Sequence, residues 1–285
     1  MARGAVVITG ASTGIGRGCA RGLAGAGFRV FAGVRKEEDE ESIGADGIEG
    51  LEPLMIDVTD SDSIAAAREA VTGALGGEGL AGLVNNAGVA VGGPMEYFPQ
   101  AEMRQIFDVN YFGAVATTQA FLPLLKRERG RIVLMSSVGG WVSTPFNAPY
   151  SSTKFALEAF GDALRVELKP WRIEVISFEP GAIATPIWDK AVGFWGTTDV
   201  ADASEEIQAD YGEALEAFLG TVEKMQADAI GVEATSKAVR QALTARRPKT
   251  RQTVGRDAWL LDNVVRRLPD RWGDAAIRRF LKLPG

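Results

Sequence analysis

The sequence predicts an α/β fold in which helices cover both faces of a mainly parallel sheet, an arrangement called doubly wound. Two observations predict it. Short β-branched runs alternate with segments long enough to be crossover helices, and several runs are apolar throughout, as strands covered on both faces are. The 285 residues, of which 46% are hydrophobic, suffice for one large domain with its own core. We therefore expect a single domain over residues 1–285.

About seven strands are expected, six of them in the first two thirds of the chain. Their expected bounds are Ala5–Thr9, Arg29–Val34, Leu54–Asp57, Ala81–Asn85, Arg131–Ser136, Ile173–Phe178 and Arg251–Val254. The expected crossover helices are Gly14–Ala26, Ser61–Leu75, Asn110–Lys126 and Ser151–Leu168. In the last of these helices apolar residues recur every three or four positions, which indicates one buried face, and Pro170 ends it.

The regular alternation lapses between Thr185 and Gly231, where aromatic residues stand among acidic ones. A stretch this long is a lid or a small helical insert. We expect 186–230 to cover a substrate, because ligands of doubly wound sheets bind beyond the carboxyl ends of the strands. The residues expected to make this pocket apolar, or to hold the lid on the core, are Trp141, Val142, Pro145, Phe146, Trp188, Phe194, Trp195, Tyr211, Phe218 and Leu219.

Composition excludes several kinds of chemistry. The chain has no histidine and one cysteine, which excludes imidazole catalysis, histidine-ligated zinc, internal disulfides and thiolate metal clusters. We expect no metal site. The net charge of −6 indicates no nucleic-acid partner. The start of the chain lacks a signal-peptide pattern and no apolar run is long enough to span a bilayer, so we expect a cytoplasmic protein.

A glycine-rich turn follows the first expected strand, in the run Thr9-Gly10-Ala11-Ser12-Thr13-Gly14-Ile15-Gly16. Glycines let the backbone turn tightly and approach a pyrophosphate, whose charge then lies on the amides of the helix N-terminus. A plain strand-to-helix turn is the alternative. The spacing is TGxxxGxG, which differs from the commoner GxGxxG fingerprint.

Together with four later motifs, this turn resembles the short-chain dehydrogenase/reductase family, and the branch of hydroxysteroid and retinol dehydrogenases in particular. The later motifs are Asn85-Asn86-Ala87-Gly88, Ser137, Tyr150-Ser-Ser-Thr-Lys154 and Pro180-Gly181. The resemblance covers Ala5 to Thr185. It implies a Rossmann-type domain and an enzyme that interconverts a ketone or aldehyde with an alcohol, using the pro-S hydride of NAD(P)H. A dinucleotide-binding sensor or scaffold without turnover is the alternative.

The resemblance also implies which residues hold the dinucleotide. Asp57 is expected at the adenine amine and Val58 on the ring, although an acid there could also cap a helix. Thr185 is expected at the nicotinamide carboxamide, with a helix cap before Pro186 as the alternative. The other expected cofactor residues are Gly10, Ser12, Thr13, Gly14, Ile15, Gly16, Asn86, Ala87, Gly88, Tyr150, Lys154, Pro180, Gly181 and Ile183.

Cofactor choice depends on the end of the second strand, where NAD-binding relatives of this fold have an acid that repels a 2′-phosphate. Here Val34 stands at that position and Arg35 follows it. A guanidinium can bind a phosphate through two parallel charge-assisted bonds, so we expect NADP(H) to be favoured over NAD(H). The alternative is that Arg35 is a solvated loop arginine beside the acidic run 37–41.

Tyr150 and Lys154 stand four apart, so their side chains share one helix face. Carbonyl reduction needs a proton donor, and a lysine ammonium together with an oxidised nicotinamide should lower the tyrosine pKa from about 10. By resemblance Ser137 holds the substrate oxygen and Asn110 supports a water linked to Lys154, although an asparagine there could instead cap a helix. The expected catalytic residues are Asn110, Ser137, Tyr150 and Lys154.

The end of the chain is basic, with 13 basic and 5 acidic residues after 230. We expect residues 257–285 to form a helical extension. Its last part, Trp272–Leu283, has apolar residues on one half of a helical wheel and basic residues on the other. We expect it to pack on its own domain or on a sister subunit; contact with an anionic membrane surface is the alternative. A homodimer or homotetramer and a small lipophilic carbonyl or alcohol substrate complete the expectations.

Overall fold

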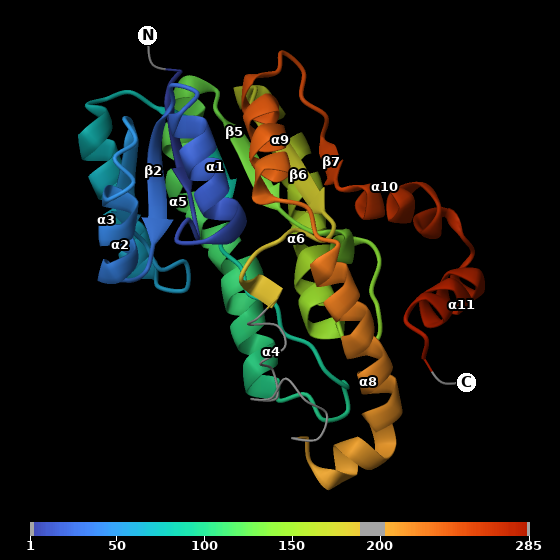
Figure 1. The fold of residues 1–285 in the computed structure, drawn as a ribbon. Helices are drawn as coiled ribbons and strands as arrows, with labels where there is room; N and C mark the ends of the chain where they lie inside the picture. Colours follow the sequence, from blue (N-terminus) through green and yellow to red (C-terminus); the bar gives the residue numbers. More distant parts are fainter. Residues whose placement is uncertain (1–2, 189–202, 284–285) are drawn as a thin grey trace.

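The computed structural model of the chain describes residues 3–188 and 203–283. It contains one parallel sheet of seven strands in the order β3-β2-β1-β4-β5-β6-β7, with helices on both faces (Figure 1). This confirms the predicted doubly wound fold. The strands are β1 Ala5–Ile8, β2 Arg29–Val34, β3 Leu51–Met55, β4 Leu80–Asn85, β5 Arg131–Met135, β6 Glu174–Pro180 and β7 Arg251–Val254.

Each face of the sheet has its own core. On one face Cys19 of α1 and Val239 of α9 are fully buried against alternate strand residues such as Val6. On the other face Phe121 of α5 and Leu157 of α6 pack against residues such as Val7. The helices of the first face are α1 Gly14–Ala24, α2 Glu37–Gly44 and α9 Val232–Thr244, and those of the second are α3 Ser61–Leu75, α5 Gly113–Glu128 and α6 Ala148–Glu167.

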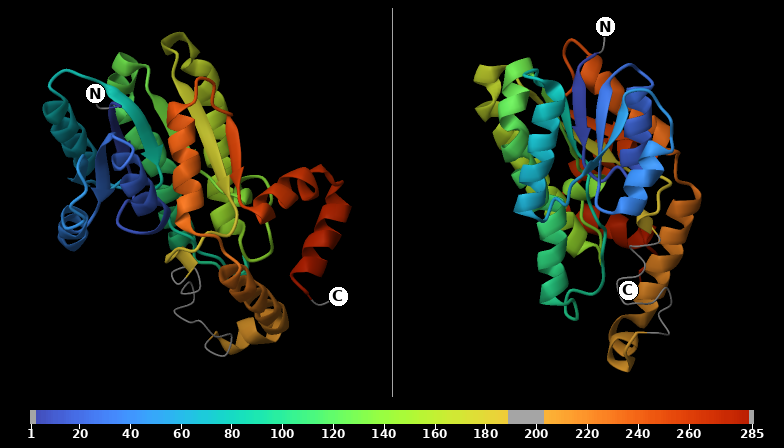
Figure 2. Two further views of the ribbon diagram at one scale, coloured as in Figure 1. Left: turned by 45° about the horizontal axis from the view of Figure 1, so that its top comes forward. Right: turned by 90° about the vertical axis from the view of Figure 1, so that its left-hand side faces the viewer.

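The remaining helices lie beyond the carboxyl ends of the strands or beside them. Figures 1 and 2 show α4 and α8 extending past the end of the sheet toward which the strands point, and the last helices leaving the body after β7. They are α4 Gln100–Phe107, α8 Glu205–Ala227, α10 Arg256–Asn263 and α11 Asp270–Phe280. Short helical turns are the π-helical Asp108–Phe112 and the 3-10 turns Val138–Gly140, Lys169–Trp171 and Val265–Arg267.

Several predicted bounds were wrong. The third strand begins at Leu51 instead of Leu54 and ends before Asp57. Pro53 argues against a strand in the sequence, because proline cannot donate a backbone hydrogen bond. β3 is an edge strand, however, where a proline removes no hydrogen bond that the sheet needs. The acidic run that follows Arg35 forms α2, with four acidic residues in its first turn, where the helix dipole favours them. The helix predicted from Asn110 is longer, since α4, the π turn and α5 follow one another without a break.

Candidate active site

The glycine turn lies between β1 and α1 at the point where the strand order reverses, beside β4. Gly10 and Gly14 have φ angles of +64° and +53°, which favour glycine. A Cβ on Gly10 would lie 2.7 Å from the Cα of Ala87. The turn therefore packs against the segment after β4 in a way that only glycine permits.

Hydrogen bonds lock this turn to that segment. Asn86 Nδ2 donates to the carbonyl oxygens of Thr9 and Gly10, both at 3.0 Å. The Thr9 hydroxyl accepts from the backbone amides of Asn86 and Ala87, also at 3.0 Å. Gly16 does not line the cavity. A Cβ there would lie 2.2 Å from the Gly10 oxygen, so Gly16 packs beneath the turn, where no larger residue fits.

A cavity of about 1400 Å³ opens above the turn and the carboxyl ends of the strands. Its wall includes every predicted cofactor residue except Gly16. The turn fits a dinucleotide pyrophosphate, because no side chain caps the first amides of α1 and Ser12, Thr13, Gly14 and Ile15 line the cavity there. Thr185 packs beside this turn, since a Cβ on Gly14 would lie 3.2 Å from its Cβ.

The far end of the cavity is polar. Arg35 and Lys36 follow β2, are exposed and belong to the wall. Asp57 lies in the loop after β3, where one carboxylate oxygen accepts from the amide and hydroxyl of Thr59 at 2.9 and 2.7 Å. Partial burial alone would raise its pKa, but those hydrogen bonds and the charge of Arg35 lower it. Asp60 caps α3 by accepting from the amide of Asp62, so Asp57 is not the cap.

The expected reacting groups converge around Gly139, in the turn after β5. A Cβ on that glycine would lie 3.3 Å from Cε1 of Tyr150 and 3.5 Å from Oγ of Ser137. The Ser137 hydroxyl accepts from the amide of Gly139 at 3.1 Å. One turn along α6 from Tyr150, Lys154 Nζ donates to the carbonyl oxygen of Met135 at 2.8 Å and lies 5.5 Å from the centre of the Tyr150 ring. All three side chains line the cavity.

Burial governs the ionisation of this pair. It raises the pKa of Tyr150 above its usual value, against a hydrogen bond with Ser137 that lowers it. It lowers the pKa of Lys154 to about 8, against the charge of Glu158, which raises it. Among the protein's own groups, the desolvation of the phenolate is the largest influence on the Tyr150 pKa, so the expected lowering would have to come from Lys154 acting together with an oxidised nicotinamide.

Asn110 lies behind this wall and not in it. It is 1% exposed, on the π-helical turn between α4 and α5. Its amide oxygen accepts from the amide of Val89 at 2.8 Å, and its nitrogen donates to the Val89 oxygen and the Thr153 hydroxyl at 2.9 and 3.0 Å. Asn110 thus fixes the segment after Gly88 to the helix that bears Lys154. It does not cap a helix.

The loop after β6 is held by a residue that the sequence did not single out. The Asp257 carboxylate, at the start of α10, accepts from the amide of Ala182 at 2.7 Å, and a Cβ on Gly181 would lie 2.1 Å from it. Ile183 pairs with Ile230 in an isolated parallel bridge. Asp257 is one of five acidic residues in the basic end of the chain, and no pattern in the sequence distinguishes it from the others. Asn85, the first residue of the motif Asn85-Asn86-Ala87-Gly88, donates to the Thr118 hydroxyl in the core.

The other end of the cavity is apolar and is built by the last third of the chain. From the predicted pocket residues, Val142, Phe146, Trp188, Phe218 and Leu219 line it. Tyr211 does not; its hydroxyl donates to Glu96 at 2.9 Å and its ring packs edge-on against Phe146. Trp141 and Pro145 also lie outside the wall, while Phe194 and Trp195 lie outside the described residues. Residues that the sequence reasoning did not place here are Leu215, Val222, Met225, Leu260, Leu261, Val265, Ala276, Ile277, Phe280 and Leu281.

Helix α11 has the amphipathic character that the sequence indicates, but none of its residues is buried. Ala276, Ile277 and Phe280 turn toward the cavity, and Phe280 is still 61% exposed. Only Leu281, after the helix, is buried. The helix was expected to pack on its own domain or on a sister subunit; on its own domain, Leu281 is the one described residue of this segment that is buried. No helix in the described ranges 3–188 and 203–283 is long and apolar enough to cross a membrane.

Comparison with known proteins agrees with this geometry. The family model of the short chain dehydrogenases matches residues 4–193. The chain is 35% identical to the NADPH-dependent 3-dehydrocapnine reductase of Ornithobacterium rhinotracheale, over 97% of this chain and 96% of that protein. It is 36% identical to mouse retinol dehydrogenase 16, over 95% and 87%. A crystal structure of a short-chain dehydrogenase from Streptomyces avermitilis superposes with a TM-score of 0.76 at 30% identity, covering 96% of this chain and 97% of the other.

Proposed function

The chain belongs to the short-chain dehydrogenase family and is an oxidoreductase; within that family we propose that it interconverts a lipophilic ketone or aldehyde with its alcohol, with NADP(H) as cofactor. The observation that carries the proposal is the convergence of Ser137 and Tyr150 around Gly139, with Lys154 Nζ 5.5 Å from the centre of the Tyr150 ring and all three side chains lining one cavity. A carbonyl there would meet a proton donor and a hydrogen-bond donor together.

The roles of the three side chains follow from their places. In the reducing direction the half-buried Tyr150 hydroxyl donates its proton to the substrate oxygen, and its raised pKa keeps it protonated at neutral pH. The Ser137 hydroxyl orients that oxygen. The Lys154 ammonium, fixed by the Met135 carbonyl, supplies the positive charge that favours the phenolate left behind. When bound, NADPH supplies the hydride.

The preference for NADP(H) rests on Arg35 and Lys36. Both are exposed at the polar end of the cavity, and no described residue forms an ion pair with either. Val34, where an acid would repel a 2′-phosphate, is apolar and 2% exposed. The name of the reductase from Ornithobacterium rhinotracheale, which states NADPH dependence, supports the same preference.

The lipophilic substrate rests on the apolar end of the cavity. The described part of 186–230, mainly α8, would act as the lid, and the described part of 257–285 would form the opposite wall as a helical extension of the single domain. The similarity to retinol dehydrogenases supports this substrate class. Exposed Phe112, Phe155 and Val166, at the start of α5 and on α6, support the expected homodimer or homotetramer. The cytoplasmic location stays a prediction.

A turnover assay tests the proposal. Consumption of NADPH and of NADH is followed with steroid, retinoid, aliphatic and quinone carbonyls, for the wild type and for Tyr150→Phe. We expect turnover of lipophilic carbonyls with NADPH, and its loss by about 100-fold or more in the variant. Equal turnover by the variant would overturn the role of Tyr150. Dinucleotide binding without turnover of any carbonyl would favour the sensor or scaffold alternative.

A further inference from the structure

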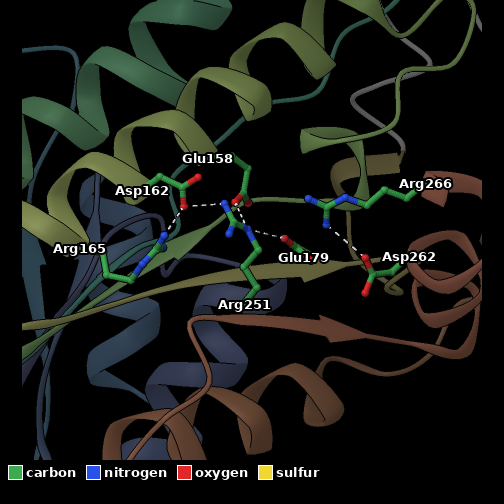
Figure 3. Close-up of polar contacts among 7 residues, drawn as sticks. All are labelled: Glu158, Asp162, Arg165, Glu179, Arg251, Asp262 and Arg266. Carbon is green, nitrogen blue, oxygen red and sulfur yellow. Dashed lines mark hydrogen bonds and ion pairs between the residues drawn. The ribbon is translucent and has the colours of Figure 1, made fainter. Parts of the chain in front are cut away.

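Two carboxylic acids are buried behind the catalytic wall. Glu158 lies one turn after Lys154 on α6, and Glu179 lies on β6; their side chains are 9% and 2% exposed. Arg251 of β7 reaches both, with Nε 3.1 Å from Glu158 and 3.4 Å from Glu179 (Figure 3). A buried carboxylate is costly unless it is paired. Two of them share one guanidinium here.

The Arg251 guanidinium also binds a third carboxylate. Arg251 Nη2 also binds Asp162 at 2.6 Å, and Asp162 is held by Arg165 at 2.7 Å. On the other side of Glu179, Arg266 pairs with Asp262 at 3.2 Å. Figure 3 shows these groups arranged around the two buried acids, from α6, β6, β7, α10 and the turn after it. Glu158 Oε1 is buried and has no hydrogen-bond partner.

The cluster leaves negative charge that Arg251 does not fully balance. Burial and the charge of Glu158 raise the pKa of Glu179 to about 7; Arg251 and Arg266 oppose this, and Asp262 adds to it. The pair therefore carries its full negative charge only above neutral pH. Below that, Glu179 gains a proton and the charge on the pair falls.

Glu158 stands four residues after Lys154, so the two side chains lie on one face of α6, and the turn after Ser137 packs against both residues. A Cβ on Gly140, in the turn after Ser137, would lie 3.0 Å from Cγ of Glu158, 3.2 Å from the carbonyl oxygen of Lys154 and 2.7 Å from Oγ of Ser136. Lys154 is 4% exposed, and burial favours loss of its proton. The charge of Glu158 is the influence that opposes this loss.

We propose that Glu158 is a positioning residue for the reaction: its carboxylate is the counter-charge that keeps the buried Lys154 ammonium protonated, and Glu179 and Arg251 set how much charge it presents. The proposal rests on the function proposed above, in which the Lys154 ammonium favours the Tyr150 phenolate. It assigns a role to a carboxylate that touches neither the substrate nor the cofactor.

The direct test is the protonation midpoint of Lys154. It can be measured without turnover, from the ¹³C shift of its ε-carbon in protein with labelled lysine, assigned with Lys154→Arg. The wild type should titrate near 8. Glu158→Gln should lower the midpoint by about one unit, and Glu179→Gln by less, because its charge is farther away and half neutralised at pH 7. The matched control is Asp162→Asn, which also loses a partner of Arg251 but whose carboxylate is 46% exposed; it should move the midpoint by no more than about 0.2 units.

Activity supplies the second readout. Glu158→Gln should lower kcat for alcohol oxidation about twofold at pH 7; the deficit should shrink toward pH 6 as Lys154 regains its proton and approach tenfold by pH 9. An unchanged midpoint in a folded Glu158→Gln protein, or an equal shift in Asp162→Asn, would overturn the proposal. If Glu158→Gln does not fold, Glu179→Gln decides in the same way. If the wild type shows no turnover, the proposed function is wrong. The protonation midpoints of Lys154 in the wild type and the variants then still test this inference.

Discussion

The two ends of the cavity are built in different ways. At the dinucleotide end the wall comes from short motifs at the ends of β1, β4 and β5, and its supports are buried: Lys154 is 4% exposed and Asn110 1%. At the substrate end the wall comes from α8, α10 and α11, where Leu260 and Phe280 are 53% and 61% exposed. The first end is locked by hydrogen bonds to the sheet, and the second is held by apolar contacts between helices.

This difference separates the chemistry from the choice of substrate. Groups that move a proton must be held closely, and the sheet edge does this through bonds such as that from Lys154 Nζ to Met135. An apolar wall only has to exclude water and match a shape, so its residues can vary without disturbing the reaction. Changes at the dinucleotide end should therefore affect every substrate alike, and changes at the substrate end should affect some substrates only.

The largest effect should come from Lys154→Met. Loss of the ammonium beside Tyr150 should lower kcat for all carbonyls by about 100-fold or more, because the phenolate is no longer stabilised in a dry site. Steady-state kinetics with a short and a long carbonyl measure this, with circular dichroism as the control for folding. A loss confined to one of the two carbonyls would break the separation of the two ends.

Arg35→Asp should reverse the cofactor preference. An acid in place of the guanidinium repels a 2′-phosphate, so kcat/KM for NADPH should fall about 10- to 100-fold while that for NADH holds or rises. Lys36→Asp, one residue on at the same end of the cavity, should cause a smaller loss. An unchanged ratio of NADPH to NADH in Arg35→Asp would show that Arg35 is a solvated loop arginine.

The pH dependence should differ between the two directions. Burial raises the pKa of Tyr150, so the acid form needed for reduction is present at neutral pH and lost only as the pH rises through that pKa. The base form needed for oxidation should increase about tenfold per pH unit below it. Profiles of kcat from pH 6 to 10 in both directions check this. An oxidation rate that is flat between pH 6 and 9 would contradict it.

Phe218→Ala should act on long substrates alone. The ring lines the apolar end and packs against Phe146, so its loss should lower kcat/KM for a long-chain ketone about tenfold and leave a short one unchanged. Tyr211→Phe, on the same helix but outside the wall, is the control and should change neither. Equal losses for both chain lengths would place α8 in the chemistry.

The smallest effect should come from Trp272→Ala. Trp272 is 70% exposed on α11 and does not line the cavity, so kcat/KM should stay within about twofold. The same variant also tests whether α11 binds an anionic membrane surface. Equal recovery of wild type and variant on anionic vesicles would agree with the expected packing on the protein itself or a second copy. Retention of the wild type alone would favour the membrane alternative.

The dinucleotide end was predictable from the sequence because its signals are local. The turn Gly10–Gly16 shows in its glycines, and α3 has the predicted bounds Ser61–Leu75 because a capping Asp60 and Gly76 mark its ends. The substrate end was less predictable, because its wall forms only when segments distant in the chain meet. The apolar residues of α11 were visible as one half of a helix, but nothing local shows that Ile277 and Phe280 face the same cavity as Gly10.

Asp257 and the Glu158–Glu179 pair show the same limit for polar groups. Asp257 binds Ala182, 75 residues away in the chain, and Glu158 binds Arg251, 93 residues away. A carboxylate in the sequence has no mark that distinguishes a buried one from a solvated one. The acidic run of α2 and the buried Glu179 therefore look alike until the fold places them.

The central claim is that Tyr150 and its neighbours reduce a carbonyl with the hydride of NADPH. Stereospecifically deuterated NADPH tests it most directly, with product analysis by mass spectrometry for the wild type and for Tyr150→Phe. We predict deuterium from the pro-S position on the carbinol carbon of a lipophilic alcohol, and at least about 100-fold less product from the variant. Label from the pro-R position, no label in any product, or equal labelling by Tyr150→Phe would contradict the account.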